Sequence, residues 1–254
     1  MLKLYHLKKR NKNLTVFSGC LYLDTVPSGI EGLDEILNGG FPKRRIILVT
    51  GGPGTGKTVF AIQYLYHGAV NLGEKGVFIS LEEPVERIKE NMRRFGFDLE
   101  KPIKEGKLSF VELTPIQFTT IKPSGLIHLI REKVKPGVER LAIDPLTTIM
   151  LQEKDIYQQR LDLMRLFKTL SELDCTAVVT SEARYAMLKR RFHAEEFLAD
   201  GVVILHKIVL KGRVIQALQV EKMRGTPHDT QLRPYKITEK GIVVYPKERV
   251  IELE

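Results

Sequence analysis

One loop in this chain constrains its fold more than any other stretch. Residues 51–58 read Gly-Gly-Pro-Gly-Thr-Gly-Lys-Thr and fit the pattern Gly-x-x-x-x-Gly-Lys-Thr. Branched apolar residues at 46–50 precede the loop, and a helix-compatible run at 59–70 follows it. Strand, glycine loop and helix in this order are typical of a P-loop, whose backbone N–H groups point inward at phosphate oxygens. The alternative for the pattern taken alone is a glycine-rich turn.

The last residues of the loop predict separate roles in binding a nucleoside triphosphate. Lys57 would reach the β- and γ-phosphates, and the Thr58 hydroxyl would hold Mg²⁺. The positive end of the following helix adds to the attraction for phosphate. We therefore expect ATP and Mg²⁺ as cofactors, with the nucleotide bound by Gly52, Pro53, Gly54, Thr55, Gly56, Lys57, Thr58 and Val59.

Strand-like and helix-like stretches alternate after the loop. Buried strands are expected at 46–50, 77–81, 108–113, 140–144 and 176–180. This alternation predicts an α/β fold with a mainly parallel sheet that helices cover on both faces. From residue 201 on, strand-like runs follow one another with turns between them, so we expect antiparallel strands at 202–210, 214–220 and 235–245.

A short helix is expected ahead of the P-loop strand. Ser28 and Glu31 have the spacing of a capping box, and Ile30, Leu33 and Leu37 share a helical face. The helix should therefore begin at Ser28, and the glycines at 39–40 should end it.

Acidic residues end two of the predicted strands. Asp144 is the last residue of the strand at 140–144, and Glu82 and Glu83 follow the strand at 77–81. Because the carboxyl ends of parallel strands face one ligand crevice, these side chains should meet the P-loop there. We predict that Asp144 holds Mg²⁺ with Thr58, and that one glutamate, preferably Glu82, activates the attacking water. The alternative for the glutamates is a solvated pair at a helix N-terminus.

Length and charge limit what else the chain can be. Its 254 residues suffice for one large domain, which we place at 25–248 after a basic N-terminal segment at 1–24. Apolar runs are too short for a membrane helix, so we expect a cytoplasmic protein without a membrane partner. Two distant cysteines indicate neither a disulfide framework nor a thiolate zinc site. The net charge of +9 raises attraction to polyanions.

Further short motifs are spread along most of the chain. Besides the loop at 51–58 they comprise Thr25, Pro27, Gly29, Gly32, Leu33, Asp34, Gly39, Gly40, Pro42, Glu82, Glu83, Lys222, Arg224, Gly225, Thr226, His228, Tyr235, Ile237, Thr238 and the stretch 241–246. Together they resemble the KaiC family of RecA-like P-loop ATPases.

The resemblance implies a RecA-like core that assembles as a ring, normally a hexamer, with ATP between neighbouring subunits. It implies that Glu82 and Glu83 are the catalytic pair and that Asp144 is the metal-associated carboxylate. It also implies that Lys222 and Arg224 reach the nucleotide of the neighbouring subunit. Their positive charges would neutralise phosphate charge during transfer. From the residues alone, the stretch around Lys222 and Arg224 is only a basic strand end in solvent.

Two departures limit the resemblance. Clock KaiC proteins carry two tandem copies of this domain, and this chain carries one. Where the phosphorylated copy has a Ser-Thr pair, this chain has Glu196 and Phe197, so no hydroxyl is present to accept phosphate. An autokinase clock role is therefore disfavoured.

A basic cluster raises the question of a nucleic-acid partner. In RecA-like recombinases, the loops after the strands that correspond to 140–144 and 176–180 face the central channel and touch DNA. Here the second of these loops, at 181–192, contains two aromatic rings and the basic residues Arg184, Lys189, Arg190 and Arg191. The alternative is a salt-bridged ring lining, with Glu195 and Glu196 as partners.

Three functions remain open from the sequence. The first is an ATP-hydrolysing oligomeric ring that couples hydrolysis to a partner, which could be DNA. The second is a slow, ATP-bound regulatory or DNA-associated scaffold with a kinase or recombination-accessory role. The third, a kinase for a small metabolite, is less favoured because nothing resembles a substrate lid.

Overall fold

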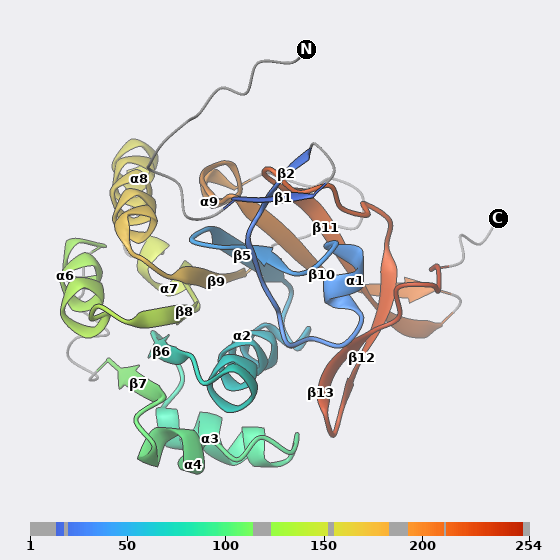
Figure 1. Ribbon diagram of the computed structural model, residues 1–254, viewed down its shortest axis with the longest axis horizontal. Coiled ribbons are helices and arrows are strands. Elements are labelled where there is room, and N and C mark those ends of the chain that lie inside the picture. Colours follow the sequence, from blue (N-terminus) through green and yellow to red (C-terminus); the bar gives the residue numbers. More distant parts are fainter. Residues whose placement is uncertain are drawn as a thin grey trace.

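The protein is built around a central mixed β-sheet (Figure 1). The computed structural model describes residues 14–17, 20–113, 123–151, 155–182, 193–210 and 212–250. The described strands of this sheet follow the order β13-β12-β11-β10-β5-β9-β8-β6-β7, and neighbours from β10 to β7 are parallel. The parallel strands are β5 (Ile46–Gly51), β6 (Lys75–Ser80), β7 (Leu108–Glu112), β8 (Val138–Asp144), β9 (Thr176–Glu182) and β10 (Gly201–Leu210). The predicted α/β fold with a mainly parallel sheet is thus confirmed.

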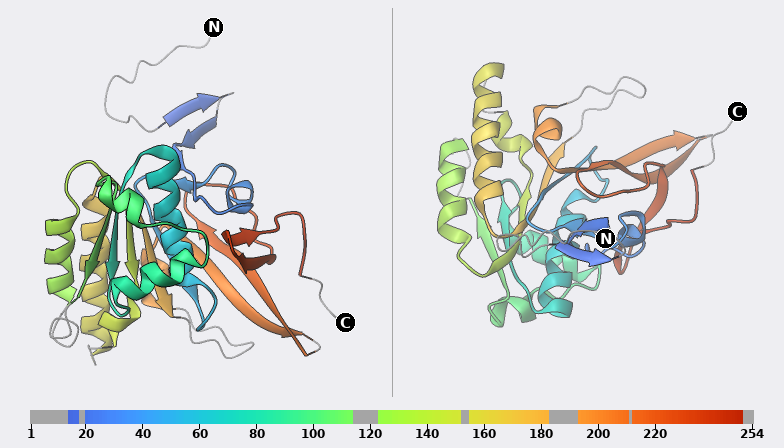
Figure 2. Two further views of the ribbon diagram at one scale, coloured as in Figure 1. Left: turned by 90° about the horizontal axis from the view of Figure 1, so that it is seen from below. Right: turned by 45° about the horizontal axis from the view of Figure 1, so that its top comes forward.

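Helices cover both faces of the parallel strands (Figures 1 and 2). In β5, Ile47 and Val49 belong to one apolar core and Ile46 and Leu48 to the other, because successive strand residues point to opposite faces. The first core packs on α2 (Lys57–His67) and α3 (Val85–Arg93), with α4 (Glu100–Lys104) beside them. The second packs on α6 (Pro123–Lys133), α7 (Thr147–Met150), α8 (Ile156–Glu172) and α9 (Ala194–Leu198). The P-loop strand is therefore fully buried between two helical layers.

The C-terminal strands are antiparallel, as expected. β11 (Arg213–Met223) pairs with β10 along its whole length. β12 (Arg233–Thr238) pairs with β11 only at Ala217–Pro234 and Leu218–Arg233, and otherwise with β13 (Gly241–Val244). The sheet consequently forks between β11 and β12.

The described N-terminal part contains two two-stranded antiparallel sheets and one short helix. β1 (Leu14–Phe17) pairs with β2 (Cys20–Leu23), and β3 (Thr25–Val26) pairs with β4 (Phe41–Pro42). Helix α2 continues into a π-helical turn, η1 (Gly68–Leu72). Within the described residues, every helix is too short or too polar to cross a membrane.

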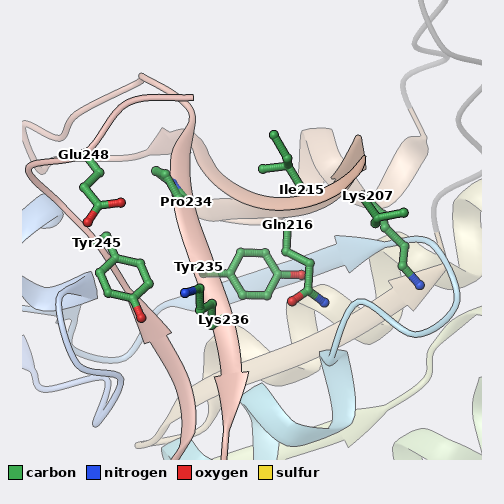
Figure 3. Close-up of a pocket in the computed structure, with 9 residues that line it drawn as sticks. Lys207, Ile215, Gln216, Pro234, Tyr235, Lys236, Tyr245 and Glu248 are labelled. Atoms are coloured by element: carbon green, nitrogen blue, oxygen red, sulfur yellow. The ribbon is translucent and has the colours of Figure 1, made fainter. Parts of the chain in front are cut away.

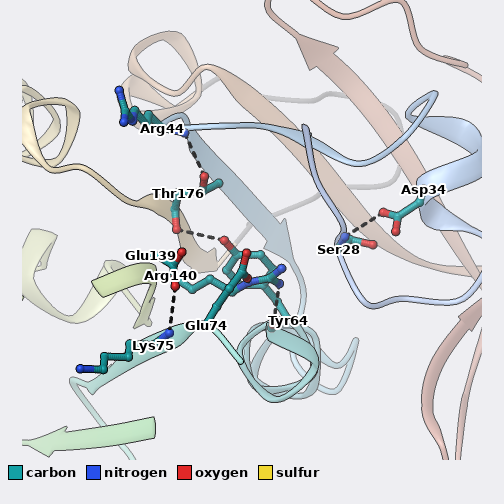
Figure 4. Close-up of polar contacts among 9 residues, drawn as sticks. All are labelled: Ser28, Asp34, Arg44, Tyr64, Glu74, Lys75, Glu139, Arg140 and Thr176. Atoms are coloured by element: carbon teal, nitrogen blue, oxygen red, sulfur yellow. Dashed lines mark hydrogen bonds and ion pairs between the residues drawn. The ribbon is translucent and has the colours of Figure 1, made fainter. Parts of the chain in front are cut away.

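The predicted capping box at Ser28 is wrong. Helix α1 spans only Leu33–Ile36, and its N-cap is Gly32 in the left-handed conformation with φ of 80°. The Ser28 hydroxyl accepts the N–H of Ile30 at 3.1 Å instead, and the Ser28 N–H donates to Asp34 at 2.9 Å (Figure 4). The left-handed glycine interrupts the helix that the spacing predicted. The apolar part of the prediction holds, because Ile30, Leu33 and Leu37 are buried.

A buried arginine near the start of β8 holds α2 against the sheet, at the end of the strands remote from the P-loop (Figure 4). The Arg140 guanidinium is fully buried; it pairs with Glu74, donates to the Tyr64 carbonyl at 2.8 Å and lies 4.5 Å from the centre of the Tyr64 ring. The Tyr64 hydroxyl donates to the carbonyl of Thr176 in β9 at 3.0 Å. One helix is thereby attached to two neighbouring strands.

One buried amide joins three distant parts of the chain. The Gln63 side chain, on α2, donates to the carbonyls of Gly29 and Ile242, each at 3.1 Å, and accepts the N–H of Ile242 at 2.7 Å. Because these backbone groups are away from water, each would be costly to leave unpaired. Gln63 therefore attaches the C-terminal hairpin to the P-loop helix.

We predict that Gln63→Ala lowers the free energy of unfolding by about 2–4 kcal/mol, because it leaves buried backbone groups without partners. Urea unfolding followed by circular dichroism measures this. Gln231→Ala, at an exposed position, serves as the control. Equal stability of the two variants would contradict the role given to Gln63.

Candidate functional site

The P-loop has the conformation that its sequence requires. Gly54 and Gly56 have φ values of 70° and 92°, in the left-handed region that favours glycine, and α2 begins directly after Gly56. The Lys57 ammonium donates to the carbonyls of Gly51 and Gly52 at 3.0 and 3.1 Å. Lys57 thus folds back over its own loop, from where it can turn to phosphate oxygens.

The C-terminal hairpin supports the loop from behind. The buried Tyr235 hydroxyl of β12 donates to the carbonyl of Thr55 at 2.7 Å. A Cβ on Gly56 would lie 2.7 Å from the tip of the Ile237 side chain, which would have to move, and the φ of 92° at Gly56 also disfavours any larger residue. No local sequence pattern indicates these contacts, because Tyr235 and Thr55 are 180 positions apart.

Asp144 lies where its strand predicted, at the carboxyl edge beside the P-loop. Its side chain is buried and accepts the Thr58 hydroxyl at 2.7 Å. The Thr180 hydroxyl, from the neighbouring strand β9, donates to the second carboxylate oxygen. Burial raises the pKa of Asp144, and these two hydroxyl hydrogen bonds oppose the rise. Thr180 is a positioning residue that the sequence did not reveal.

The donor set here fits a magnesium ion bound together with phosphate. One hydroxyl and one carboxylate are in contact, and the described residues contain no cluster of three or more His, Cys, Asp or Glu side chains that could hold a metal alone. Mg²⁺ keeps several waters and is commonly held by one or two protein ligands plus substrate phosphates. Thr58 and Asp144 would therefore hold Mg²⁺ once a nucleotide supplies further oxygens.

Acidic residues form a rim around a cleft of about 470 Å³ beside the P-loop. Its lining includes Lys57, Asp144 and three glutamates, Glu82, Glu83 and Glu182. Burial lowers the pKa of Lys57, and the nearby carboxylates of Glu182, Asp144 and Glu82 oppose this. The sequence missed Glu182, although it ends β9 at the same edge and the rule applied to Asp144 would have found it.

The two predicted catalytic glutamates differ in their contacts. Glu83 accepts a hydrogen bond from Asn91 at 3.1 Å and lies 3.5 Å from the Arg87 guanidinium. Burial raises the pKa of Glu83, and the positive charge of Arg87 opposes the rise. Among the described residues, the hydrogen-bond contact of the Glu82 side chain is a long one of 3.5 Å with the Thr148 hydroxyl. Glu82 is therefore the less constrained of the pair.

Lys222 and Arg224 do not lie at this site. Gly201 pairs with both Ile47 of β5 and Met223 of β11, so the end of β11 lies at the edge where β5 begins. The P-loop starts at the other end of β5, about 13 Å away at about 3.3 Å per residue. The carbonyl of Phe197 accepts from Arg224 at 2.9 Å and from Lys222 at 3.4 Å.

The predicted basic cluster of Arg184, Lys189, Arg190 and Arg191 lies outside the described residues. Glu195, offered as its partner, accepts a hydrogen bond from Ser181 at 2.9 Å and is buried. Glu196 is also buried, whereas the Phe197 side chain is 61% exposed. A nucleic-acid partner therefore stays a prediction.

Most of this chain matches a known protein family. Residues 26–249 match the family model described as ATPase: KaiC. The chain belongs to the KaiC ATPase family. It is accordingly a nucleotide-binding protein with a RecA-like fold, as the motifs predicted.

Relatives share both the sequence and the fold. A UPF0273 protein of Methanocaldococcus jannaschii is 34% identical over 90% of this chain and 98% of its own length. A circadian clock oscillator protein KaiC of Prochlorococcus marinus is 37% identical over 89% of this chain but only 46% of its own length. The crystal structure of a KaiC-like protein of Pyrococcus horikoshii, 38% identical, superimposes with a TM-score of 0.78 and covers 87% of this chain and 99% of that one.

We predict opposite effects of Asp144→Asn on stability and on metal binding. Because burial raises the pKa of Asp144, its ionised form costs folding free energy at neutral pH, and the cost disappears as the pH falls. Without Mg²⁺ the variant should therefore unfold at a higher temperature than the wild-type protein at neutral pH, and the difference should shrink in acid. Mg²⁺ should no longer tighten nucleotide binding.

Calorimetric melting curves across pH and titration with a fluorescent ATP analogue measure the two effects. A lower unfolding temperature at neutral pH, or an unchanged response to Mg²⁺, would contradict this account of Asp144.

Proposed function

We propose that this protein binds ATP with Mg²⁺ and hydrolyses it in a ring of identical subunits, with each nucleotide between two neighbours. The observation that carries the proposal is that the basic side chains expected to bind phosphate lie at opposite ends of the strands of one sheet. Lys57 lies at the carboxyl edge among the carboxylates, whereas Lys222 and Arg224 lie at the opposite edge. A head-to-tail contact that joins these two edges would complete the site, and such contacts form rings when the rotation closes.

The P-loop, Asp144 and Glu82 would have separate roles in this reaction. Backbone N–H groups of the P-loop and Lys57 would bind the phosphates, and Thr58 and Asp144 would hold Mg²⁺. When bound, Mg²⁺ neutralises charge on the phosphate oxygens. Glu82 would orient the attacking water and accept its proton, because Glu83 already accepts from Asn91 and faces Arg87.

Lys222 and Arg224 would act on the neighbouring copy. The Arg224 side chain is about half exposed, and its contacts are with the Phe197 carbonyl and, at 3.8 Å, with Asp200. Exposed contacts of this kind contribute little, so the side chain can turn outward at small cost. A cation that arrives from a second subunit couples hydrolysis to assembly, which suits a protein that switches or remodels a partner.

We predict that Arg224→Ala slows ATP hydrolysis on the order of a thousandfold, as loss of a trans arginine does, while nucleotide binding is largely kept. Phosphate release under saturating Mg-ATP and light scattering on the same sample measure turnover and assembly. Arg165→Ala, on the exposed side of α8, is the control. Wild-type turnover after Arg224→Ala would remove the shared site. A wild-type protein that forms a ring but does not turn over ATP would favour the ATP-bound scaffold.

The pH dependence of hydrolysis should depend on Arg87. Its charge lowers the pKa of Glu83, so Arg87→Gln should raise that pKa further. We expect hydrolysis to need both glutamates of the cleft ionised, with Glu82 as the base and Glu83 beside it, so the acid limb of the rate profile should move to higher pH in this variant. Arg93→Gln, on the same helix but paired with Glu100, should leave the limb in place. Identical acid limbs in all three proteins would contradict a role for Glu83 in the reaction.

A further inference from the structure

The fork of the sheet leaves one strand edge open. Beyond Ala217, β12 turns away from β11, and residues 213–216 pair only with β10 among the described strands. Their backbone groups that face away from β10 form an edge about 13 Å long, at about 3.3 Å per residue. An open edge of this kind is a template for a further strand.

The P-loop keeps the fork apart. Tyr235, directly after the last pair of β11 and β12, is buried with its hydroxyl on the carbonyl of Thr55. Ile237, two residues on, packs against Gly56. Because these contacts hold β12 against the loop, β12 turns away from β11, and no other strand in the described part of the chain pairs with residues 213–216.

A basic cleft of about 380 Å³ occupies the fork (Figure 3). Tyr235 and Gln216 lie in its middle, with Lys236 on one side and Lys207 on the other. Both lysines are exposed, and the Lys236 ammonium lies 5.8 Å from the centre of the Tyr245 ring. Among the described residues that line the cleft, Glu248 alone carries a carboxylate, and exposed Arg213 begins the open edge. The charge therefore favours an acidic occupant.

We propose that this fork binds an extended acidic segment of a partner protein, which adds as a strand to residues 213–216 of β11. Backbone hydrogen bonds to the open edge would supply affinity whatever the sequence of the segment. Lys207 and Lys236 would select acidic side chains and reject basic ones. A second copy of this chain and a free small anion are the competing occupants that the test separates.

Occupation of the fork would act on the nucleotide site. A Cβ on Gly54 would lie 3.3 Å from the Lys207 ammonium, so this lysine lies beside the P-loop while lining the cleft. A segment that draws Lys207 away, or presses on Tyr235, changes the support of the loop. This consequence rests on the proposed function, whereas the binding of the segment does not.

The test uses the full chain without nucleotide and a fluorescent peptide of alternating glutamate and valine. Fluorescence anisotropy should show saturable binding that weakens with added salt. Lys207→Glu and Lys236→Glu should each weaken it about tenfold or more, which corresponds to about 1.4 kcal/mol. Lys240→Glu makes the same charge change in the turn after β12, outside the cleft, and should bind as the wild-type protein does.

A second set of probes tests strand addition. The same peptide with N-methyl groups on alternate amides should lose its binding, because it cannot complete backbone hydrogen bonds. A lysine–valine peptide should not bind. Equal binding of the methylated peptide, equal weakening by Lys240→Glu, or no binding up to about 1 mM would each overturn the proposal.

The competing occupants and the nucleotide site have their own readouts. Displacement of the peptide by inorganic phosphate at equal concentration would assign the cleft to small anions and overturn the proposal. A dimer that dissociates on Lys207→Glu and excludes the peptide would assign it to a second copy, with the same result. Turnover is measured separately, so failure of the ATPase proposal leaves the peptide result unaffected.

Discussion

The structure around the nucleotide site depends on one buried carboxylate. Ionised Asp144 is costly to bury, and the hydroxyls of Thr58 and Thr180 offset part of that cost. In doing so they join β8 to the first turn of α2 and to β9, so three elements meet at one point. In the proposed function Mg²⁺ would relieve the remaining cost, so Asp144 would be destabilising until the ion is bound.

The sheet then divides the functional groups between its two edges. At the carboxyl edge lie the P-loop and the glutamates, and at the opposite edge lie Lys222 and Arg224. A parallel sheet imposes this separation, because residues at opposite ends of neighbouring strands cannot approach one another within one copy. The fork adds a third position, since Tyr235 connects the C-terminal hairpin to the back of the P-loop. In these proposals the nucleotide binds to the P-loop, Arg224 of a neighbouring subunit approaches that nucleotide, and a strand-like partner binds behind the P-loop.

Short sequence patterns predicted the features that depend only on residues close together in the chain. The P-loop follows from its glycines, and the position of Asp144 follows from the end of its strand. The capping box at Ser28 failed because a left-handed glycine, Gly32, interrupts the turn and forms the N-cap itself. Glu182 was missed although the same strand-end rule covers it, because the strand was expected to end before it.

The remaining contacts could not be predicted from the sequence. Gln63 bonds to Ile242 across 179 residues, and Tyr235 bonds to Thr55 across 180. Each single residue reads as an ordinary helix or strand position, since only the packed fold brings the partners together. Thr180 likewise became a partner of Asp144 only because β8 and β9 are neighbours in the sheet.

The central claim is that two copies of the chain build each nucleotide site, and mixing two inactive variants tests it most directly. Lys57→Ala lacks the phosphate-binding lysine but keeps Arg224, and Arg224→Ala has the reverse defect. In equal mixture, random assembly should pair an intact P-loop with an intact arginine at about a quarter of the sites, so phosphate release should return to about a quarter of the wild-type rate. If the mixture is as inactive as its components, although both assemble, the site lies within one subunit and the account is wrong.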